Sequence, residues 1–408
     1  MKIALVSPYD FAYPGGVVNH IMSLGRQLTQ MGHEVKFIAP ASSPITTLGD
    51  RFIHIGKPRA IPVSGSVARV TVSPRLSTEI TRMLDREKFD IVHLHEPLMP
   101  MLCTTVLRMS RTANVGTFHA FDGKGYNIAK PFVGPIFFKR WFSKLDGHIA
   151  VSNPAKKFVN KYFPADYKII PNGVDTKHFS PEVAPIAEFD DGKLNILFVG
   201  RLEKRKGANY LLKAYQQVKR DVPNSRLIIV GPGTRLRDKY EKQVKKLGLR
   251  DVVFVGYASY DELPRYYKTA DIFCAPATGW ESFGIVLLEA MAVAKPVVAS
   301  NIDGYASILT HGTEGLLVPP KNAKSLAQAL TSLLSDETLR EEMGNRGRLK
   351  AQEYDWENVA RRVLDLYREV LVRSQHRETF SLRRMIIEDT RKLFSRKVRA
   401  HAKTDRSS

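Results

Sequence analysis

The sequence predicts an α/β protein built from two doubly wound, Rossmann-like domains that face one cleft. Short apolar runs rich in β-branched residues alternate with helical stretches, in two successive series. Runs that are apolar on both faces are typical of parallel sheets covered by helices on each side. At 408 residues, the chain is long enough for two such domains.

The two series give the expected strands and the domain boundaries. The first series predicts strands that begin at Lys2, His33, Asp90, Val115 and His148. The second predicts strands that begin at Leu194, Arg226, Val252, Ile272, Pro296 and Gly315. Between them, residues 180–193 combine proline, glycine and acids, as an interdomain linker does. We therefore expect an N-terminal domain over 1–180, a C-terminal domain over 181–360, a helix over 361–372 packing back toward the N-terminal domain, and a basic tail over 373–408.

The net charge of +21 is distributed unevenly. Residues 1–180 carry 23 Lys and Arg against 12 Asp and Glu, residues 181–370 carry 28 against 25, and residues 371–408 carry 11 against 4. This excess makes nucleic acid, anionic lipid and small anionic substrates the candidate partners. The sequence has no nucleic-acid module signature and no aromatic stacking platform among its basic residues, so we expect no nucleic-acid partner.

Cysteine content and hydropathy indicate the compartment. Only Cys103 and Cys274 occur, which fits a reducing compartment without a disulfide framework. The apolar run after Lys2 is too short for a signal peptide, and no run approaches the ~18 residues of a membrane span. We expect a cytoplasmic protein, attached to a membrane only at its surface.

Ligands of open parallel sheets bind at the carboxyl ends of the strands, and two segments there suit an anion. Gly15 and Gly16 follow the first strand and precede a helix, whose N-terminus can bind phosphate. A plain turn is an equal alternative. Arg201 and Lys206 follow the first strand of the second series, although such a basic loop is more often solvated surface. The sequence has no P-loop and no D-x-D motif, so we expect neither a cofactor nor a metal to hold a diphosphate.

Glu281 and Glu289 bracket the apolar segment S-F-G-I-V-L-L. Buried carboxylates are costly unless something binds them. Eight residues of helix would let both side chains reach one groove at heights about 12 Å apart. The N–H groups of Ser282, Phe283 and Gly284 would then point from the helix start toward a ligand.

These segments, together with H-L-H-E-P and G-L-L-V-P-P, resemble the retaining glycosyltransferases of family four, which have the two-Rossmann-domain GT-B fold. Within that family the likeness is greatest to phosphatidylinositol mannosyltransferases that use GDP-mannose, and it covers roughly residues 1–370. The resemblance implies that Glu281 faces the donor sugar, that Glu289 holds the ribose hydroxyls, and that His119 lies over the sugar once the domains close. The catalytic residues it implies are His119, Glu281, Arg201 and Lys206. The donor-binding residues it implies are Gly16, Arg201, Lys206, Glu281, Ser282, Phe283, Gly284, Ile285 and Glu289.

The resemblance also implies a mechanism and an acceptor site. In a front-face retaining reaction, the leaving diphosphate helps to remove the acceptor proton, and Arg201, Lys206 and backbone amides stabilise the charge that develops. The acceptor-binding residues it implies are Tyr9, Asp10, Gly15, Asn19 and Lys124. Polar family positions near the inositol phosphate are occupied here by Val18, Leu98 and Ala120.

The acceptor therefore stays open between two alternatives. Either Asp10, Asn19 and Asp122 replace the missing polar groups, or the acceptor differs. The expected function is transfer of mannose from GDP-mannose to a phosphatidylinositol-like lipid at the cytoplasmic membrane face. The alternative is a UDP- or GDP-sugar-dependent enzyme acting on another glycolipid, a soluble sugar phosphate or a polysaccharide.

Two segments suggest an anionic membrane partner. Between Lys130 and Lys144, four aromatic residues (137, 138, 141 and 142) alternate with cations, which suits a lipid headgroup boundary. The alternative is that these aromatics form the core face of a helix. In the tail, Leu382, Ile386 and Leu393 recur at helical spacing among basic residues, although a solvated tail fits equally well.

Overall fold

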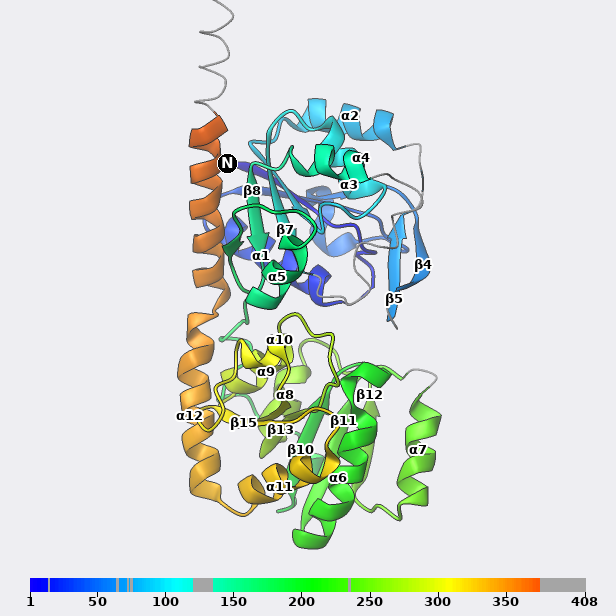
Figure 1. The fold of residues 1–408 in the computed structure, drawn as a ribbon, viewed down its shortest axis with the longest axis vertical. Helices are drawn as coiled ribbons and strands as arrows, with labels where there is room; N and C mark the ends of the chain where they lie inside the picture. The colour runs from blue at the N-terminus through cyan, green and yellow to red at the C-terminus, as the bar shows by residue number, and fades with distance from the viewer. Residues whose placement is uncertain are drawn as a thin grey trace, which may run out of the picture.

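A computed structural model describes residues 1–13, 15–63, 66–71, 73, 76–119, 135–233 and 236–374, and these form two α/β domains stacked along the long axis (Figure 1). Each domain contains a parallel sheet flanked by helices. The predicted fold class is confirmed.

The N-terminal domain contains a seven-stranded parallel sheet in the order β3-β2-β1-β6-β7-β8-β9. Its strands are β1 (Lys2–Val6), β2 (Glu34–Ala39), β3 (Phe52–His54), β6 (Ile91–His95), β7 (Ala113–Phe118), β8 (Gly147–Ala150) and β9 (Lys168–Ile169). Its helices are α1 (Gly16–Gln30), α2 (Ser77–Glu87), α3 (Leu102–Met109), α4 (Pro135–Phe142) and α5 (Asn153–Asn160). An antiparallel hairpin, β4 (Pro58–Val63) and β5 (Ser66–Thr71), is added to this plan.

The C-terminal domain contains a six-stranded parallel sheet in the order β12-β11-β10-β13-β14-β15. Its strands are β10 (Leu194–Val199), β11 (Ser225–Val230), β12 (Val252–Gly256), β13 (Ile272–Ala275), β14 (Val297–Ser300) and β15 (Gly315–Val318). Its helices are α6 (Ala208–Asp221), α7 (Arg237–Lys246), α8 (Leu263–Thr269), α9 (Ile285–Ala292), α10 (Asp303–Ala306), α11 (Ala323–Leu334) and α12 (Glu337–Glu353).

The strand order reverses direction once in each sheet, between β1 and β6 and between β10 and β13. At such a switch point the connecting helices leave to opposite faces, which opens a crevice outside the carboxyl ends of the two strands. These crevices are where the two domains present their loops to a ligand.

The chain connects the domains at two places, and Val174 and Asp355 form a parallel bridge there. A helix over residues 356–374 then runs along the N-terminal domain (Figure 1). Its buried face, which includes Val363, Tyr367 and Val370, joins the core cluster that contains Ile3 and Leu5 of β1. The last helix therefore completes the core of the first domain. Among the described residues, no helix is both long enough and apolar enough to cross a bilayer.

Helix α4 carries the aromatic residues for which the sequence predicts contact with a lipid headgroup boundary. Phe138 is buried, and Trp141 and Phe142 pack against the same core cluster. Phe142 stacks on Phe163 with ring centroids 5.2 Å apart. The core-face alternative is therefore correct for these three residues, and only Lys139 and Arg140 of this helix are exposed cations. Residues 130–134, the side chain at 137 and the tail with Leu382, Ile386 and Leu393 lie outside the described residues.

Candidate functional site

A cavity of about 1280 Å³ lies between the two domains, at the carboxyl ends of both sheets. The N-terminal domain contributes the loops after β1, β6 and β7 and the start of α1, and the C-terminal domain contributes the loops after β10 to β13 and the start of α9. The predicted site residues that line it are Tyr9, Gly15, Gly16, Asn19, His119, Arg201, Lys206, Glu281, Ser282, Phe283, Gly284, Ile285 and Glu289.

Asp10 does not line this cavity, contrary to expectation. Its side chain is buried, and Oδ1 accepts hydrogen bonds from the N–H groups of Ala12 (3.1 Å) and Ser42 (2.9 Å). Oδ1 thus fixes two loops of the N-terminal domain, whereas Oδ2 is buried and has no hydrogen-bond partner among the described residues, so the acceptor-binding role expected for Asp10 stays a prediction. Lys124 and Asp122 lie outside the described residues.

Glu281 belongs to the loop before α9 rather than to the helix itself, which begins at Ile285. The expectation that both carboxylates share one helix is therefore wrong. Glu281 Oε1 lies 2.5 Å from Nη1 of Arg205 and 2.9 Å from Nζ of Lys206. Burial opposes ionisation of this carboxyl, but Lys206 and Arg205 outweigh it and lower its pKa. Glu281 is therefore an anion fixed by two cations.

Glu289 lies in α9, and its environment differs from that of Glu281. The hydroxyl of Tyr267 donates to Oε2 of Glu289 at 2.7 Å. Burial raises the pKa of Glu289 to about 7, against the smaller opposite effects of Tyr267 and Lys206. The two carboxyls of the motif thus differ in protonation near neutral pH.

The turn that joins Glu281 to α9 depends on Gly284. Its φ of +133° is a conformation that residues with side chains rarely adopt, and a Cβ there would lie 2.8 Å from the ring of Tyr305. Phe283, one residue earlier, is buried in the core of the C-terminal domain. This side-chain anchor and the glycine together place the backbone of the loop against the cavity.

A second loop, residues 200–206 after β10, brings three cations to the cavity: Arg201, Arg205 and Lys206. Glu203 pairs with two of them, at 3.2 Å from Arg201 and 2.9 Å from Arg205. The carbonyl of Arg205 also accepts a hydrogen bond from Thr278 N–H at 2.7 Å, which ties this loop to the one after β13. Arg205 was not singled out from the sequence, although it stands in the same K-R-K segment as Lys206.

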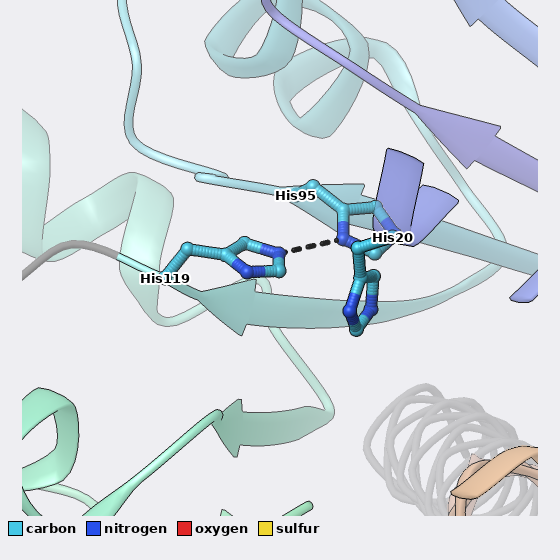
Figure 2. Close-up of side chains that lie close together, drawn as sticks. All are labelled: His20, His95 and His119. Atoms are coloured by element: carbon cyan, nitrogen blue, oxygen red, sulfur yellow. Dashed lines mark hydrogen bonds between the residues drawn. The ribbon is translucent and has the colours of Figure 1, made fainter. Parts of the chain in front are cut away.

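His119 follows β7 and lies in a cluster of buried imidazoles (Figure 2). Its Nε2 is 3.0 Å from Nδ1 of His95, and its backbone N–H donates to Glu96 Oε1 at 2.8 Å. His20 packs edge-on against His119, with centroids 4.7 Å apart, and pairs with Asn172 Oδ1 at 2.8 Å. Burial lowers the pKa of His119 and His95 well below the usual value and that of His20 to about 4. His119 is therefore a neutral, hydrogen-bonded side chain.

Neutral imidazoles are also good metal ligands, and one nitrogen from each of the three rings lies within 4.8 Å of the others. Nitrogen ligands of a tetrahedral ion lie roughly 3.4 Å apart, so the rings would have to move together to hold one. Instead, His95 pairs with His119, and His20 pairs with Asn172. We interpret this cluster as a hydrogen-bonded support for His119.

Comparison with known proteins supports a single family. The family model described as "Glycosyltransferase Family 4" matches residues 14–178, and "Glycosyl transferases group 1" matches residues 180–350. A Mycobacterium leprae protein named phosphatidyl-myo-inositol mannosyltransferase is 36% identical over 374 residues, covering 91% of this chain and 97% of that protein.

Two solved structures show the same fold. Sucrose-phosphate synthase from Thermosynechococcus elongatus has a TM-score of 0.71 at 23% identity, covering 91% of this chain and 100% of its own. Anabaena HepE, solved in complex with UDP, has a TM-score of 0.71 at 18% identity, covering 90% and 99%.

Proposed function

The chain belongs to glycosyltransferase family 4, and from that premise we propose that it transfers mannose from GDP-mannose to a phosphatidylinositol-like lipid, with retention of anomeric configuration. The observation that carries this proposal is the cavity in which Glu281 and Glu289 occupy one wall beside three cations. This arrangement offers different chemistry to the two ends of a nucleotide sugar.

The nucleoside end of the donor belongs at Glu289. An ionised carboxylate accepts hydrogen bonds from the two hydroxyls of a ribose, and such charge-assisted bonds are stronger than neutral ones. Its neighbour Tyr267 fixes one oxygen, which leaves the other carboxylate oxygen to face the ligand. Binding would therefore stabilise the charged form of Glu289.

The diphosphate belongs beside Arg201 and Lys206, with the loop before α9 on its other side. These cations stabilise the charge that grows on the leaving diphosphate, and the N–H groups of Ser282 to Gly284 add fixed dipoles. Arg205 and Lys206 also hold Glu281 in place, so that its carboxylate can orient the hydroxyls of the sugar. In this scheme no protein base is required, because a diphosphate oxygen takes the acceptor proton as the leaving bond breaks.

The N-terminal wall of the cavity supports an alternative to the phosphatidylinositol-like acceptor. Leu98, Met99, Pro100 and Met101 line it, and Asp10 does not. The side chains of these four residues offer no hydrogen bonds to the hydroxyls of an inositol phosphate, so they suit a lipid with a smaller head group at least as well. We therefore keep another glycolipid, or a soluble sugar phosphate or polysaccharide, as the alternative acceptor and a UDP-sugar as the alternative donor.

We further propose that the enzyme works at the cytoplasmic face of the membrane as a peripheral protein. Excess positive charge in residues 1–180 and in the tail supports this, because Lys and Arg near an anionic leaflet contribute about 1 kcal/mol each. The exposed Lys139 and Arg140 on α4 are part of that charge.

A donor and acceptor screen tests the proposal. GDP-mannose should raise the melting temperature more than UDP-glucose or GDP-glucose, and radiolabelled mannose should move to phosphatidylinositol but not to diacylglycerol. The anomeric proton of the isolated product should show the α configuration of the donor. Transfer to another glycolipid or to a soluble sugar phosphate instead would establish the alternative. Transfer to diacylglycerol would contradict both acceptor assignments, and no stabilisation by any nucleotide sugar would contradict the assignment of the cavity.

A further inference from the structure

A side-chain hydrogen bond from the N-terminal domain reaches the loop that carries Glu281. Ser152 is the N-cap of α5, and its Oγ accepts the N–H of Ala155 at 3.1 Å. The same hydroxyl donates to the carbonyl oxygen of Ser282 at 2.5 Å. Figure 1 shows α5 on the side of its domain that faces α9 and α10.

The position of this contact makes it more than a surface hydrogen bond. Ser152 is 3% exposed, so the hydroxyl has little access to water as a substitute partner. Ser282 is the residue directly after Glu281, and a rigid turn at Gly284 follows. A displacement of the Ser282 carbonyl would therefore move the residue before it, Glu281, and the turn at Gly284 after it.

The two domains also come near each other at the first residue of α9, three residues after Ser282. A Cβ placed on Gly16, the first residue of α1, would lie 4.0 Å from Cδ1 of Ile285. The starts of α1 and α9 thus come close together across the cavity. Ser152 therefore contacts the loop before Gly284, and Gly16 lies near the start of α9 after it.

We propose that Ser152 is a positioning residue, a latch that holds the Glu281 loop when the two domains are closed. The closed arrangement is the one in which His119 and Glu281 line the same cavity. Loss of the latch should favour the open arrangement and lower the fraction of enzyme that can transfer sugar. The effect on sugar transfer rests on the proposed function, whereas the effect on hydrogen exchange of the Glu281 loop does not.

Three substitutions separate the latch from the helix cap. Ser152→Asp keeps an oxygen that can cap α5, but its carboxylate cannot donate to the carbonyl of Ser282. Ser152→Thr keeps both the cap and the donor. Asn322→Ala removes the cap of α11, where Asn322 Oδ1 accepts from Ser325 N–H at 3.0 Å, away from the cleft.

The experiment measures hydrogen exchange over residues 282–287 in the full chain without ligand, and then kcat/KM with the donor that the screen identifies. For Ser152→Asp we expect faster exchange in this segment and a kcat/KM about three- to tenfold lower, as for one lost hydrogen bond. The loss should appear in kcat, while the Kd of the bare nucleotide stays near that of the parent. Ser152→Thr should behave like the parent, and Asn322→Ala should lower the melting temperature without either effect.

Two results would overturn the latch: parent-like exchange and kcat/KM in Ser152→Asp, or the same fall in kcat/KM in Asn322→Ala. The failure of the proposed function looks different. In that case no nucleotide sugar is a substrate for the parent, while the exchange difference between Ser152→Asp and Ser152→Thr still reports on the latch.

Discussion

Protonation of Glu289 should control how tightly the protein binds a nucleotide near neutral pH. Burial raises the pKa of this carboxyl from 4.5 to about 7. At 1.36 kcal/mol per pKa unit, the shift corresponds to at most about 3 kcal/mol, because part of the side chain faces the cavity. Since the raised pKa belongs to the folded state, this residue should make the free energy of unfolding fall as pH rises from 4.5 to 7, with no further change above 7.

The effect on binding has the opposite sign. If the ribose hydroxyls bind only the ionised carboxylate, affinity follows the ionised fraction, which is about one tenth at pH 6 and nine tenths at pH 8 for a pKa near 7. The Kd of GDP should therefore be about tenfold higher at pH 6 than at pH 8.

Glu289→Gln is the matched control, because glutamine has the same shape and does not titrate. Isothermal titration calorimetry of GDP and UDP at pH 6, 7 and 8 should show a steeper pH dependence for the parent than for this variant. The terminal phosphate of the nucleotide titrates in both proteins, so the difference between them isolates Glu289. Equal pH dependence in parent and variant would show that Glu289 does not hold the ribose, or that it is already ionised.

Five further outcomes are expected from the site and from the charge of the chain. Glu281→Gln should abolish sugar transfer in a radiolabel assay while the circular dichroism stays unchanged, and transfer at the parent rate would remove Glu281 from the mechanism. Arg205→Ala should lower kcat by tenfold or more, a rise of about 1.4 kcal/mol or above in activation free energy, because Glu281 loses a buried partner. The control is Arg346→Ala, which breaks an exposed pair with Glu342 and should leave kcat unchanged. Gly284→Ala should lower both kcat and the melting temperature, because the residue needs φ = +133° beside Tyr305. The free energy of unfolding should fall by about 1–3 kcal/mol, and a variant with parent-like melting and kcat would refute that account. Transfer should persist in EDTA, and a strict need for one divalent ion would contradict that expectation. Binding to anionic vesicles in a sedimentation assay should weaken with salt and on removal of residues after 373, and equal binding to neutral vesicles would contradict this expectation.

Much of the scaffold could be predicted because parallel strands buried on both faces have an apolar signature that does not depend on their partners. All eleven expected strands are present, for example β1 and β10, which are inner strands beside the switch points of their sheets. The strands that were missed lack this signature. β9 has two residues, and β3 is an edge strand that is only partly buried. β4 contains two prolines, and β5 pairs only with β4 in a separate two-stranded hairpin.

The site was less predictable than the scaffold because roles depend on contacts over long sequence distances. The spacing of Glu281 and Glu289 indicated one site, but not that the helix begins only at Ile285, since Gly284 stops it from extending further back. Asp10 carries the right chemistry in the right segment, but its Oδ1 accepts hydrogen bonds from two backbone N–H groups 2 and 32 residues away, which the sequence does not show. The role of Arg205 could not be predicted because it depends on folding, which places its Nη1 2.5 Å from Oε1 of Glu281, 76 positions later in the chain.

The helix over residues 356–374 has a consequence for how the molecule is made. Its side chains, including Trp356 and Tyr367, fill the core of the first domain, which is otherwise complete by β9. A ribosome at about 5–20 residues per second adds the intervening stretch of roughly 200 residues in about 10–40 s. Throughout that interval the nascent first domain exposes an apolar surface that its own sequence neighbours cannot cover. The first domain is thus synthesised first but finished last, and chimeras that exchange it must carry this helix with it.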